Sequence, residues 1–291
     1  MKNKNLEWRH MTTGITSRIY NGSRYGRGNF SPDVPVDLSR YPTVMQASPA
    51  STVSAKYGFI PTTRPVQVLS DYGWFPVAVH EAGTRDENKA GFQTHVIRFA
   101  HENYNREMAV GGTIPQLILK NDHCGMGSFS FFVGLYEKVC ANQLCVSRGS
   151  LEDVRVCHRG YADSAVEDCI RNIMGDLPSV LSNVDRFKGI ELRRHQEIAL
   201  AESAIELRWD GDAFAVRPEE LLARRHYEQR TPTLWNTYNA IQENMIRGGV
   251  RQVNADGRRS RARAVKSVKE DLRLNKALWT LTERLAEVVA A

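Results

Sequence analysis

The hydrophobic periodicity of this chain changes once, near residue 160, and that change constrains the fold more than any other feature. Before it, short runs rich in β-branched and aromatic residues are separated by turn residues, a pattern typical of antiparallel hairpins. After it, apolar residues recur at helical spacing up to the end of the chain. The sequence therefore predicts an α+β fold, in which a sheet of about five antiparallel strands is backed and followed by helices. The predicted strands cover residues 74–82, 91–100, 114–122, 128–139 and 153–160.

Capping residues and apolar spacing indicate where the helices begin and end. Ser164 followed by Glu167 forms a capping box that opens a helix over residues 162–174. Thr231 is the expected cap of the most regular helix, with Pro232 at its first position and Gly248 and Gly249 at its end. Other helices are expected over 64–73, 193–209 and 218–229, and a polar basic loop over 253–260 precedes a last helix from about Arg261.

Composition divides the chain into three parts. Residues 1–50 are rich in Gly, Ser, Thr, Asn and Pro, hold little apolar sequence, and are expected to form a flexible basic arm. Residues 51–230 are expected to form the α+β core with the hairpin sheet, and residues 231–291 a helical segment with a basic loop. The chain shows no apolar stretch of membrane-spanning length, no signal peptide and no disulfide pattern among its five cysteines. These features favour a cytoplasmic protein with no membrane partner.

Positive charge is concentrated at the two ends of the sequence. Residues 247–276 hold ten basic and three acidic residues, a net charge of +7 against +6 for the whole chain. Such a local basic field is suited to a polyanion. Part of this charge has a simpler explanation, because Lys269, Arg273 and Lys276 lie opposite the apolar stripe of the last helix and form its solvated face.

The segment RRSRAR, residues 258–263, is harder to explain as a solvated face. Arginine forks match phosphate geometry and stack on bases, whereas solubility alone would be served equally well by lysine and glutamate. Nucleic-acid contact is therefore favoured for this segment. The expected phosphate contacts are Arg251, Arg258, Arg259, Arg261, Arg263 and Lys266, with Arg155 and Arg159 added from the sheet.

No catalytic or metal-binding pattern emerges from the sequence. The spacing of Cys140, Cys145 and Cys157 is not that of a zinc site, so core thiols are the favoured interpretation and no metal or cofactor is expected. His123 and Cys124 lie among ordinary turn residues, which favours a turn over a nucleophile. The strand aromatics are expected in the core, while an exposed minority beside Arg98, Lys120 or Lys138 would offer a stacking surface for single strands.

The stretch LILKNDHCGMGSFSFFVGLYEKVCANQLCVS, residues 117–147, followed by VRVCHRG at 154–160, resembles a family of phage and plasmid proteins called domain of unknown function 932. The resemblance includes a Cys-x-Asn element at Cys140 and the family's closing helices at 233–244 and 274–281. It covers roughly residues 50–285 and departs from the usual pattern in the glycine turn, where Cys124 stands. The family transfers no active-site residues. In element order it is similar to phage single-strand annealing proteins, which hold single-stranded DNA in rings or filaments.

The charge pattern and the resemblance lead to one expected function. The chain is expected to be a phage- or plasmid-encoded, non-enzymatic protein that binds single-stranded DNA and promotes annealing or recombination as a homo-oligomeric ring or filament. The alternative is a phage interaction protein that binds and inhibits a host protein, such as a defence protein, with its basic arm and tail on an acidic surface. A nuclease with dispersed acidic residues is disfavoured, because the sequence shows no acidic cluster.

Overall fold

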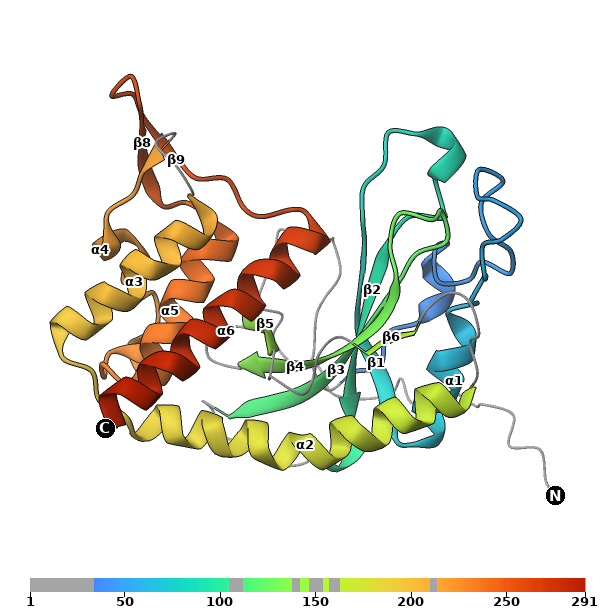
Figure 1. The fold of residues 1–291 in the computed structure, drawn as a ribbon, viewed down its shortest axis with the longest axis horizontal. Coiled ribbons are helices and arrows are strands. Elements are labelled where there is room, and N and C mark those ends of the chain that lie inside the picture. Colours follow the sequence, from blue (N-terminus) through green and yellow to red (C-terminus); the bar gives the residue numbers. More distant parts are fainter. Residues whose placement is uncertain are drawn as a thin grey trace.

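The computed structural model describes residues 34–104, 112–137, 142–146, 154–156, 163–209 and 214–290. It confirms the predicted α+β class, with an antiparallel sheet followed by a group of helices (Figure 1). Helix α1, Thr63–Asp71, precedes the sheet and ends close to the predicted position. Short 3-10 helices cover Leu38–Arg40, Glu87–Lys89 and Glu102–Tyr104.

The main sheet has the strand order β1-β2-β3-β4-β5, and every pair in it is antiparallel. The sixth strand, β6, pairs with the start of β4, on the same edge of β4 that β5 uses farther along. The strands predicted from alternation are present, while β5 was not predicted. The strands are β1 (Trp74–Glu81), β2 (His95–His101), β3 (Thr113–Asn121), β4 (Phe129–Glu137), β5 (Asn142–Val146) and β6 (Val154–Val156).

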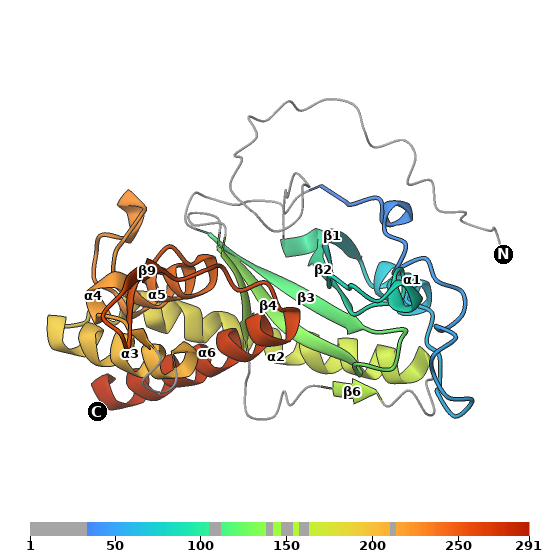
Figure 2. The ribbon, with the colours of Figure 1, turned by 90° about the horizontal axis from the view of Figure 1, so that it is seen from above.

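One face of the sheet packs against helix α2, Asp163–Gly189, which runs along it (Figures 1 and 2). Residues such as Phe99, Leu117 and Phe131 share one apolar cluster with the stripe of α2. Helix α2 is much longer than the predicted 162–174, because Leu177 and later apolar residues continue its buried stripe past Pro178. Packing on the sheet thus outweighs the helix-breaking tendency of proline.

The opposite face of the sheet is covered in part by helix α6, Val268–Ala290. Val268 and Leu272 of α6 form a separate buried cluster with Val96, Ile118 and Phe132 of the sheet. Helices α3 (Arg194–Arg208) and α5 (Leu234–Arg247) complete the helical group, and α5 is buried along most of its length. The main apolar cluster includes residues of α2, α5 and α6.

Three details of the predicted helices are wrong. The helix expected over 218–229 is only α4, Pro218–Leu221, followed by a 3-10 turn at Tyr227–Gln229. The cap of α5 is Thr233 rather than Thr231, since Thr233 Oγ1 accepts a hydrogen bond from the Asn236 amide at 3.1 Å. The last helix begins at Val268 and not near Arg261.

The residues between α5 and α6 form strands where a loop was predicted. These are β8 (Arg251–Asn254) and β9 (Arg259–Arg261). They form a small antiparallel sheet with β7 (Phe214–Ala215), which precedes α4 in the chain. Gly257, at a φ of 76°, provides the left-handed conformation that the turn between β8 and β9 requires. Among the described helices, none has the length and apolar character needed to cross a membrane.

Candidate nucleic-acid interface

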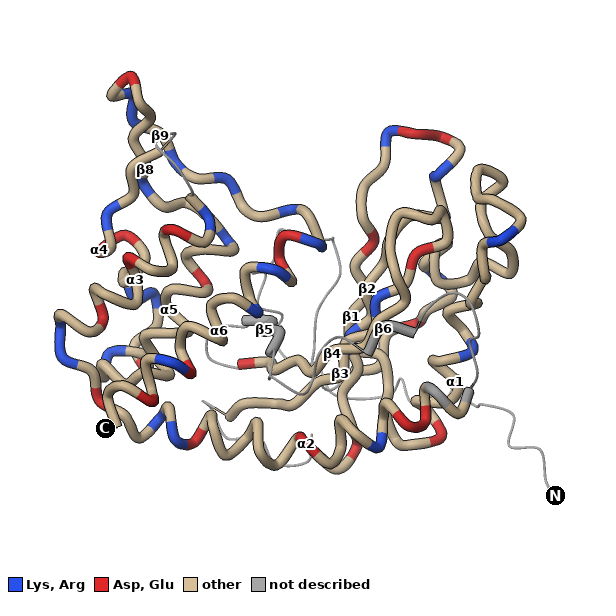
Figure 3. Tube along the Cα trace, in the orientation of Figure 1, with Lys and Arg blue, Asp and Glu red and all other residues tan. Residues whose placement is uncertain are grey.

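The β8–β9 hairpin gathers arginines on one of its faces. Arg251 pairs across the ladder with Arg261, and Val253 pairs with Arg259. Since paired residues share a face and alternate residues return to it, Arg251, Arg259 and Arg261 all lie on the same side of the hairpin. Figure 3 shows basic residues along this hairpin and along the segment that leads from it to α6.

Backbone hydrogen bonds close the base of the hairpin beside the end of α5, and the Val265 amide donates to the Ile246 carbonyl of α5 at 2.9 Å. The Gly249 amide donates to the Ala262 carbonyl at 2.8 Å, and the Ala262 amide donates to the Val250 carbonyl at 2.8 Å. Gly248, at a φ of 73°, ends α5 where the chain turns into the hairpin. The Arg208 guanidinium donates to the carbonyls of Met245 and Arg263 and so joins the end of α3 to both sides of this base.

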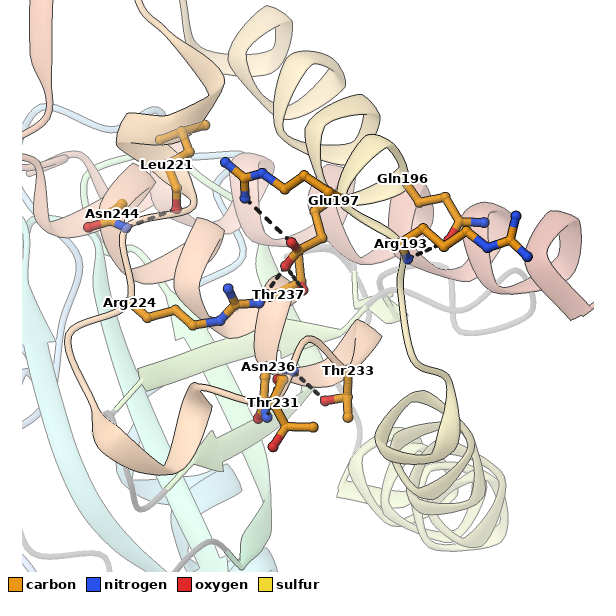
Figure 4. A network of polar contacts seen from close by, with 11 residues as sticks. Arg193, Gln196, Glu197, Leu221, Arg224, Thr231, Thr233, Asn236, Thr237 and Asn244 are labelled. Carbon is orange, nitrogen blue, oxygen red and sulfur yellow. Dashed lines mark hydrogen bonds and ion pairs between the residues drawn. The ribbon is translucent and has the colours of Figure 1, made fainter.

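A buried ion pair holds α3, α5 and the connection after α4 together (Figure 4). The Glu197 carboxylate, 4% exposed, accepts from Arg224 Nη2 at 2.5 Å and from Thr237 Oγ1 at 3.1 Å. Arg194, at the more exposed end, lies 3.4 Å from the same carboxylate. The Arg224 side chain thus bonds to both α3 and α5 from the non-helical connection that follows α4.

The next basic residues along that connection support the hairpin base directly. Arg225 Nε donates to Asn244 Oδ1 at 3.0 Å, and Arg225 Nη2 donates to the Gly248 carbonyl at 3.2 Å. Asn244 Nδ2 in turn donates to the carbonyls of Leu221 and Ala223. The buried Glu243 pairs with Arg247 at 2.7 Å. The basic residues of this region are therefore structural, including Arg247, which belongs to the charge-rich stretch 247–276.

The predicted phosphate contacts divide into two groups. Arg251 lies 3.7 Å from Glu220, and Arg261 Nη1 donates to the Gly249 carbonyl at 2.8 Å, so both have protein partners. The remaining basic side chains of the hairpin and the segment after it are exposed and make no hydrogen bond or ion pair within the described part of the chain. These side chains are Arg258, Arg259, Arg263 and Lys266.

The hairpin carries an electrostatic cost in the absence of a counter-charge. Arg251 and Arg261 lie directly opposite each other, and like charges in that position destabilise a strand pair. Glu220 offsets part of this repulsion, and Arg217 approaches the same carboxylate at 3.7 Å. Arg217 was not among the predicted phosphate contacts. It lies near Arg251 because the fold brings the start of α4 beside β8.

The two arginines predicted from the main sheet do not join this surface. Arg155 lies in β6, where its backbone pairs with Ser130, and β6 is well separated from the hairpin in both Figure 1 and Figure 2. Arg159 lies outside the described residues. The structure therefore assembles the C-terminal part of the predicted site and leaves Arg155 elsewhere.

The aromatic residues of the sheet are mostly core residues, as expected. The buried ones are Trp74, Phe99, Phe129, Phe131, Phe132 and Tyr136, while Phe75 and Phe92 are half-buried. Of the basic neighbours named for a stacking surface, Arg98 is buried, Lys120 is half-buried and Lys138 lies outside the described residues. Near the hairpin, Phe214 is 40% exposed but pairs with Asn254, which puts it on the face opposite the arginines.

The turn around Cys124 has the structure expected of turn residues. Asp122 Oδ1 accepts from the amides of Cys124 at 3.0 Å and Met126 at 2.8 Å, which closes the turn. Burial raises the pKa of the Cys124 thiol, with the neighbouring Asp122 carboxylate acting in the same direction. A thiol in this setting is a poor nucleophile at neutral pH. Among the residues described, no three His, Cys, Asp or Glu side chains come together in a way that could hold a metal ion.

The fold and the hairpin define an α+β protein with a rigid basic β-ribbon beside a helical core. The chain belongs to the family described as "Domain of unknown function (DUF932)", whose model matches residues 49–279. It is 32% identical to UPF0380 protein YafZ of Escherichia coli K12 over 268 residues, which cover 90% of this chain and 96% of YafZ. UPF0380 protein YfjQ of the same organism is 31% identical with the same coverage. No solved structure matches this chain.

Proposed function

We propose that this chain binds single-stranded DNA through the β8–β9 hairpin and the segment that follows it. One observation carries the proposal: the side chains of Arg258, Arg259, Arg263 and Lys266 are exposed on or beside an anchored ribbon and make no hydrogen bond or ion pair with the rest of the described chain. Residues 248–267 contain six basic residues and one acidic residue, Asp256. This surface has the charge of a phosphate-binding site.

The geometry favours phosphate over a generic solvated surface. Opposed arginines on one face repel each other, and an anion between them removes that repulsion. Guanidinium groups also bind phosphate oxygens in a bidentate fashion. The hairpin is held by backbone bonds and by Arg208 and Arg225, so little conformational entropy would be lost when a strand binds.

The specific role in annealing rests on the resemblance in element order to phage single-strand annealing proteins. Here too, antiparallel hairpins precede a long helix, α2, that lies along the sheet. On this proposal, a homo-oligomeric ring or filament of a phage- or plasmid-encoded protein presents successive hairpins to one strand in the host cytoplasm. It would promote pairing with a complementary strand and needs no catalytic residue.

The salt dependence of binding tests the proposal. A fluorescent oligothymidylate is titrated with wild-type protein and with R258Q/R259Q/R261Q/R263Q over a series of salt concentrations. Each lost phosphate contact should lower the magnitude of the slope of log affinity against log salt by about 0.7, so the four substitutions should lower it by up to about 2.8. The matched control removes the same charge from distant exposed positions, as R40Q/K56Q/R171Q/R186Q.

The hairpin variant should bind the oligonucleotide more weakly and with a flatter salt dependence. The control variant should show an almost unchanged slope. Equal slopes for the wild-type protein and the hairpin variant would refute the hairpin as the phosphate contact. Light scattering with and without oligonucleotide tests the assembly. Rings or filaments that grow on single strands support annealing, and a small oligomer indifferent to DNA contradicts it.

A further inference from the structure

The small sheet of β7, β8 and β9 has a second face, opposite the one on which the strand arginines gather. Gln252 pairs with Ser260 across the ladder, and Phe214 of β7 pairs with Asn254, so these four side chains lie on that second face. Strands β7 and β9 are exposed, and the β8–β9 hairpin projects away from the helical group (Figure 1). The second face is therefore a surface of its own.

Phe214 is the exposed aromatic residue of this second face. It is 40% exposed, and within the described ranges no other phenylalanine or tryptophan is exposed. A single exposed apolar residue is ordinary on a folded protein, so its exposure alone carries no conclusion. What Phe214 can bind depends on the residues beside it.

A second aromatic residue lies near Phe214 on the same face. Trp209, at the end of α3, is half-buried and donates from Nε1 to Gln252 Oε1 at 3.0 Å. Gln252 and Asn254 are two residues apart on β8, so Trp209 and Phe214 meet this strand at positions about 7 Å apart. The Arg208 guanidinium lies 4.6 Å from the centre of the Trp209 ring. Two aromatic rings and a cation thus lie together on this face.

Arg258 adds a positive charge at the opposite edge of the same face. The Asn254 amide donates to the Arg258 carbonyl at 3.1 Å, and the Arg258 amide donates to Asn254 Oδ1 at 2.7 Å. These bonds continue the β8–β9 register by one pair. Phe214, Asn254 and Arg258 therefore form one row across the small sheet, with about 10 Å between the outer two backbones.

We propose that this second face binds a base of the single strand and that Phe214 is the residue on which the base stacks. The inference rests on the proposed function, because the strand must be held by the hairpin arginines. Proteins that bind single strands combine basic grooves with aromatic side chains, since every base has a π-face. The row offers a ring for a base and, about 10 Å away, a guanidinium for a phosphate of the same strand.

The side-chain amides on this face indicate that the base is held by stacking and not by its hydrogen-bonding edge. Gln252 Nε2 donates to Ser260 Oγ at 3.2 Å, and its oxygen already accepts from Trp209. Asn254 Nδ2 donates to Asp256 Oδ2 at 3.1 Å, and its oxygen accepts from the Arg258 amide. Because these amides are engaged within the protein, the face should show little preference among bases.

The affinities for a fluorescent oligothymidylate and for an abasic strand of equal length test the role of Phe214. Phe214→Ala should weaken binding of the oligothymidylate about 5- to 100-fold and leave binding of the abasic strand unchanged. Phe214→Tyr, which keeps the ring, should bind both strands as the wild type does. Tyr227→Ala is the matched control and should have no effect, because Tyr227 is 73% exposed but precedes α5, whereas the hairpin follows this helix.

The abasic strand separates stacking from a structural role. If Phe214 only supported the ribbon, Phe214→Ala would weaken the binding of both strands to the same extent, and that result overturns the inference. Wild-type affinity of Phe214→Ala for the oligothymidylate, or an equal loss in Tyr227→Ala, overturns it as well. Failure of the proposed function is distinct, because it appears as an unchanged salt slope in R258Q/R259Q/R261Q/R263Q. Failure of the stacking inference leaves that change of slope in place and removes only the effect of Phe214→Ala.

Discussion

Replacing Gly248 by alanine should destabilise this protein more than the same replacement at the adjacent Gly249. Both glycines have a positive φ, 73° and 83°, so alanine is strained at either position. They differ in what a methyl group would meet. At Gly248 it would lie 2.6 Å from the Ala262 carbonyl oxygen and 2.7 Å from the Arg263 carbonyl carbon, whereas at Gly249 the nearest atom is Arg225 Nη2 at 3.9 Å.

The expected magnitude follows from these distances. The backbone strain common to both variants costs about 1–3 kcal/mol. The overlap at Gly248 involves backbone atoms that cannot rotate away, and forced overpacking adds about 1–3 kcal/mol. The free energies of unfolding of the two variants should therefore differ by about 2 kcal/mol, which corresponds to about 3 °C in melting temperature for a chain of 291 residues.

Thermal and urea unfolding of the two purified variants beside the wild-type protein provide the measurement. Gly248→Ala should also weaken oligonucleotide binding, since Gly248 lies where the hairpin meets α5. Equal losses of stability in the two variants would refute the reasoning, because they would show that the close approach of Gly248 to residues 262 and 263 does not exist.

Three further predictions concern the buried polar and thiol groups. Glu197→Gln leaves the Arg224 guanidinium without its buried carboxylate and should cost about 3 kcal/mol in urea unfolding, whereas Arg194→Gln, at the exposed end of the same cluster, should cost less than about 1 kcal/mol. Burial raises the pKa of Asp271 to about 6, against the effects of Arg98 and Asn275, so the folded state binds its proton more tightly than the unfolded chain does. The native carboxylate thus lowers stability at neutral pH. Asp271→Asn should stabilise the protein by about 1–2 kcal/mol at pH 8, and this gain should fall as the pH drops from 6 towards about 4; a gain independent of pH would contradict the assignment. Burial raises the pKa of Cys169 to about 12 and also raises that of Cys124, so neither should be alkylated at pH 8 until urea is added, and peptide mass spectrometry would detect early modification.

The strands of the main sheet could be predicted because their cause is local. Alternation of β-branched and aromatic residues with turn residues marks each predicted strand, and the pairing follows from the short hairpin connections. Strand β5, Asn142–Val146, has no such mark, because it is short and follows directly on β4. Its position depends on the helical group, since α6 packs against it.

The β8–β9 hairpin could not be predicted as strands for a different reason. Its residues are arginines and small polar residues, and both faces are largely exposed, so no apolar alternation exists to read. The hairpin forms because Gly248 and Gly257 adopt a positive φ and because backbone hydrogen bonds fix the base of the hairpin. The sequence did indicate the charge, and the structure shows which of those charges already have protein partners.

The cap of α5 shows how tertiary contacts choose between two reasonable signals. Thr231 followed by Pro232 matches the pattern of a helix start, and Thr233 is an equally good cap by residue type. The later start is selected because the Leu234 amide donates to the Ile190 carbonyl at 2.8 Å, which joins the first turn to the end of α2.

The proposed function depends most on the β8–β9 hairpin being the surface that contacts single-stranded DNA. Photo-crosslinking of the full chain to an oligothymidylate that carries 4-thiothymidine, followed by peptide mass spectrometry, maps that contact directly. If the hairpin is the contact, the crosslinked peptides should cluster within residues 251–266, and crosslinking there should fall in R258Q/R259Q/R261Q/R263Q. Crosslinks that fall on the main sheet and spare the hairpin would contradict it.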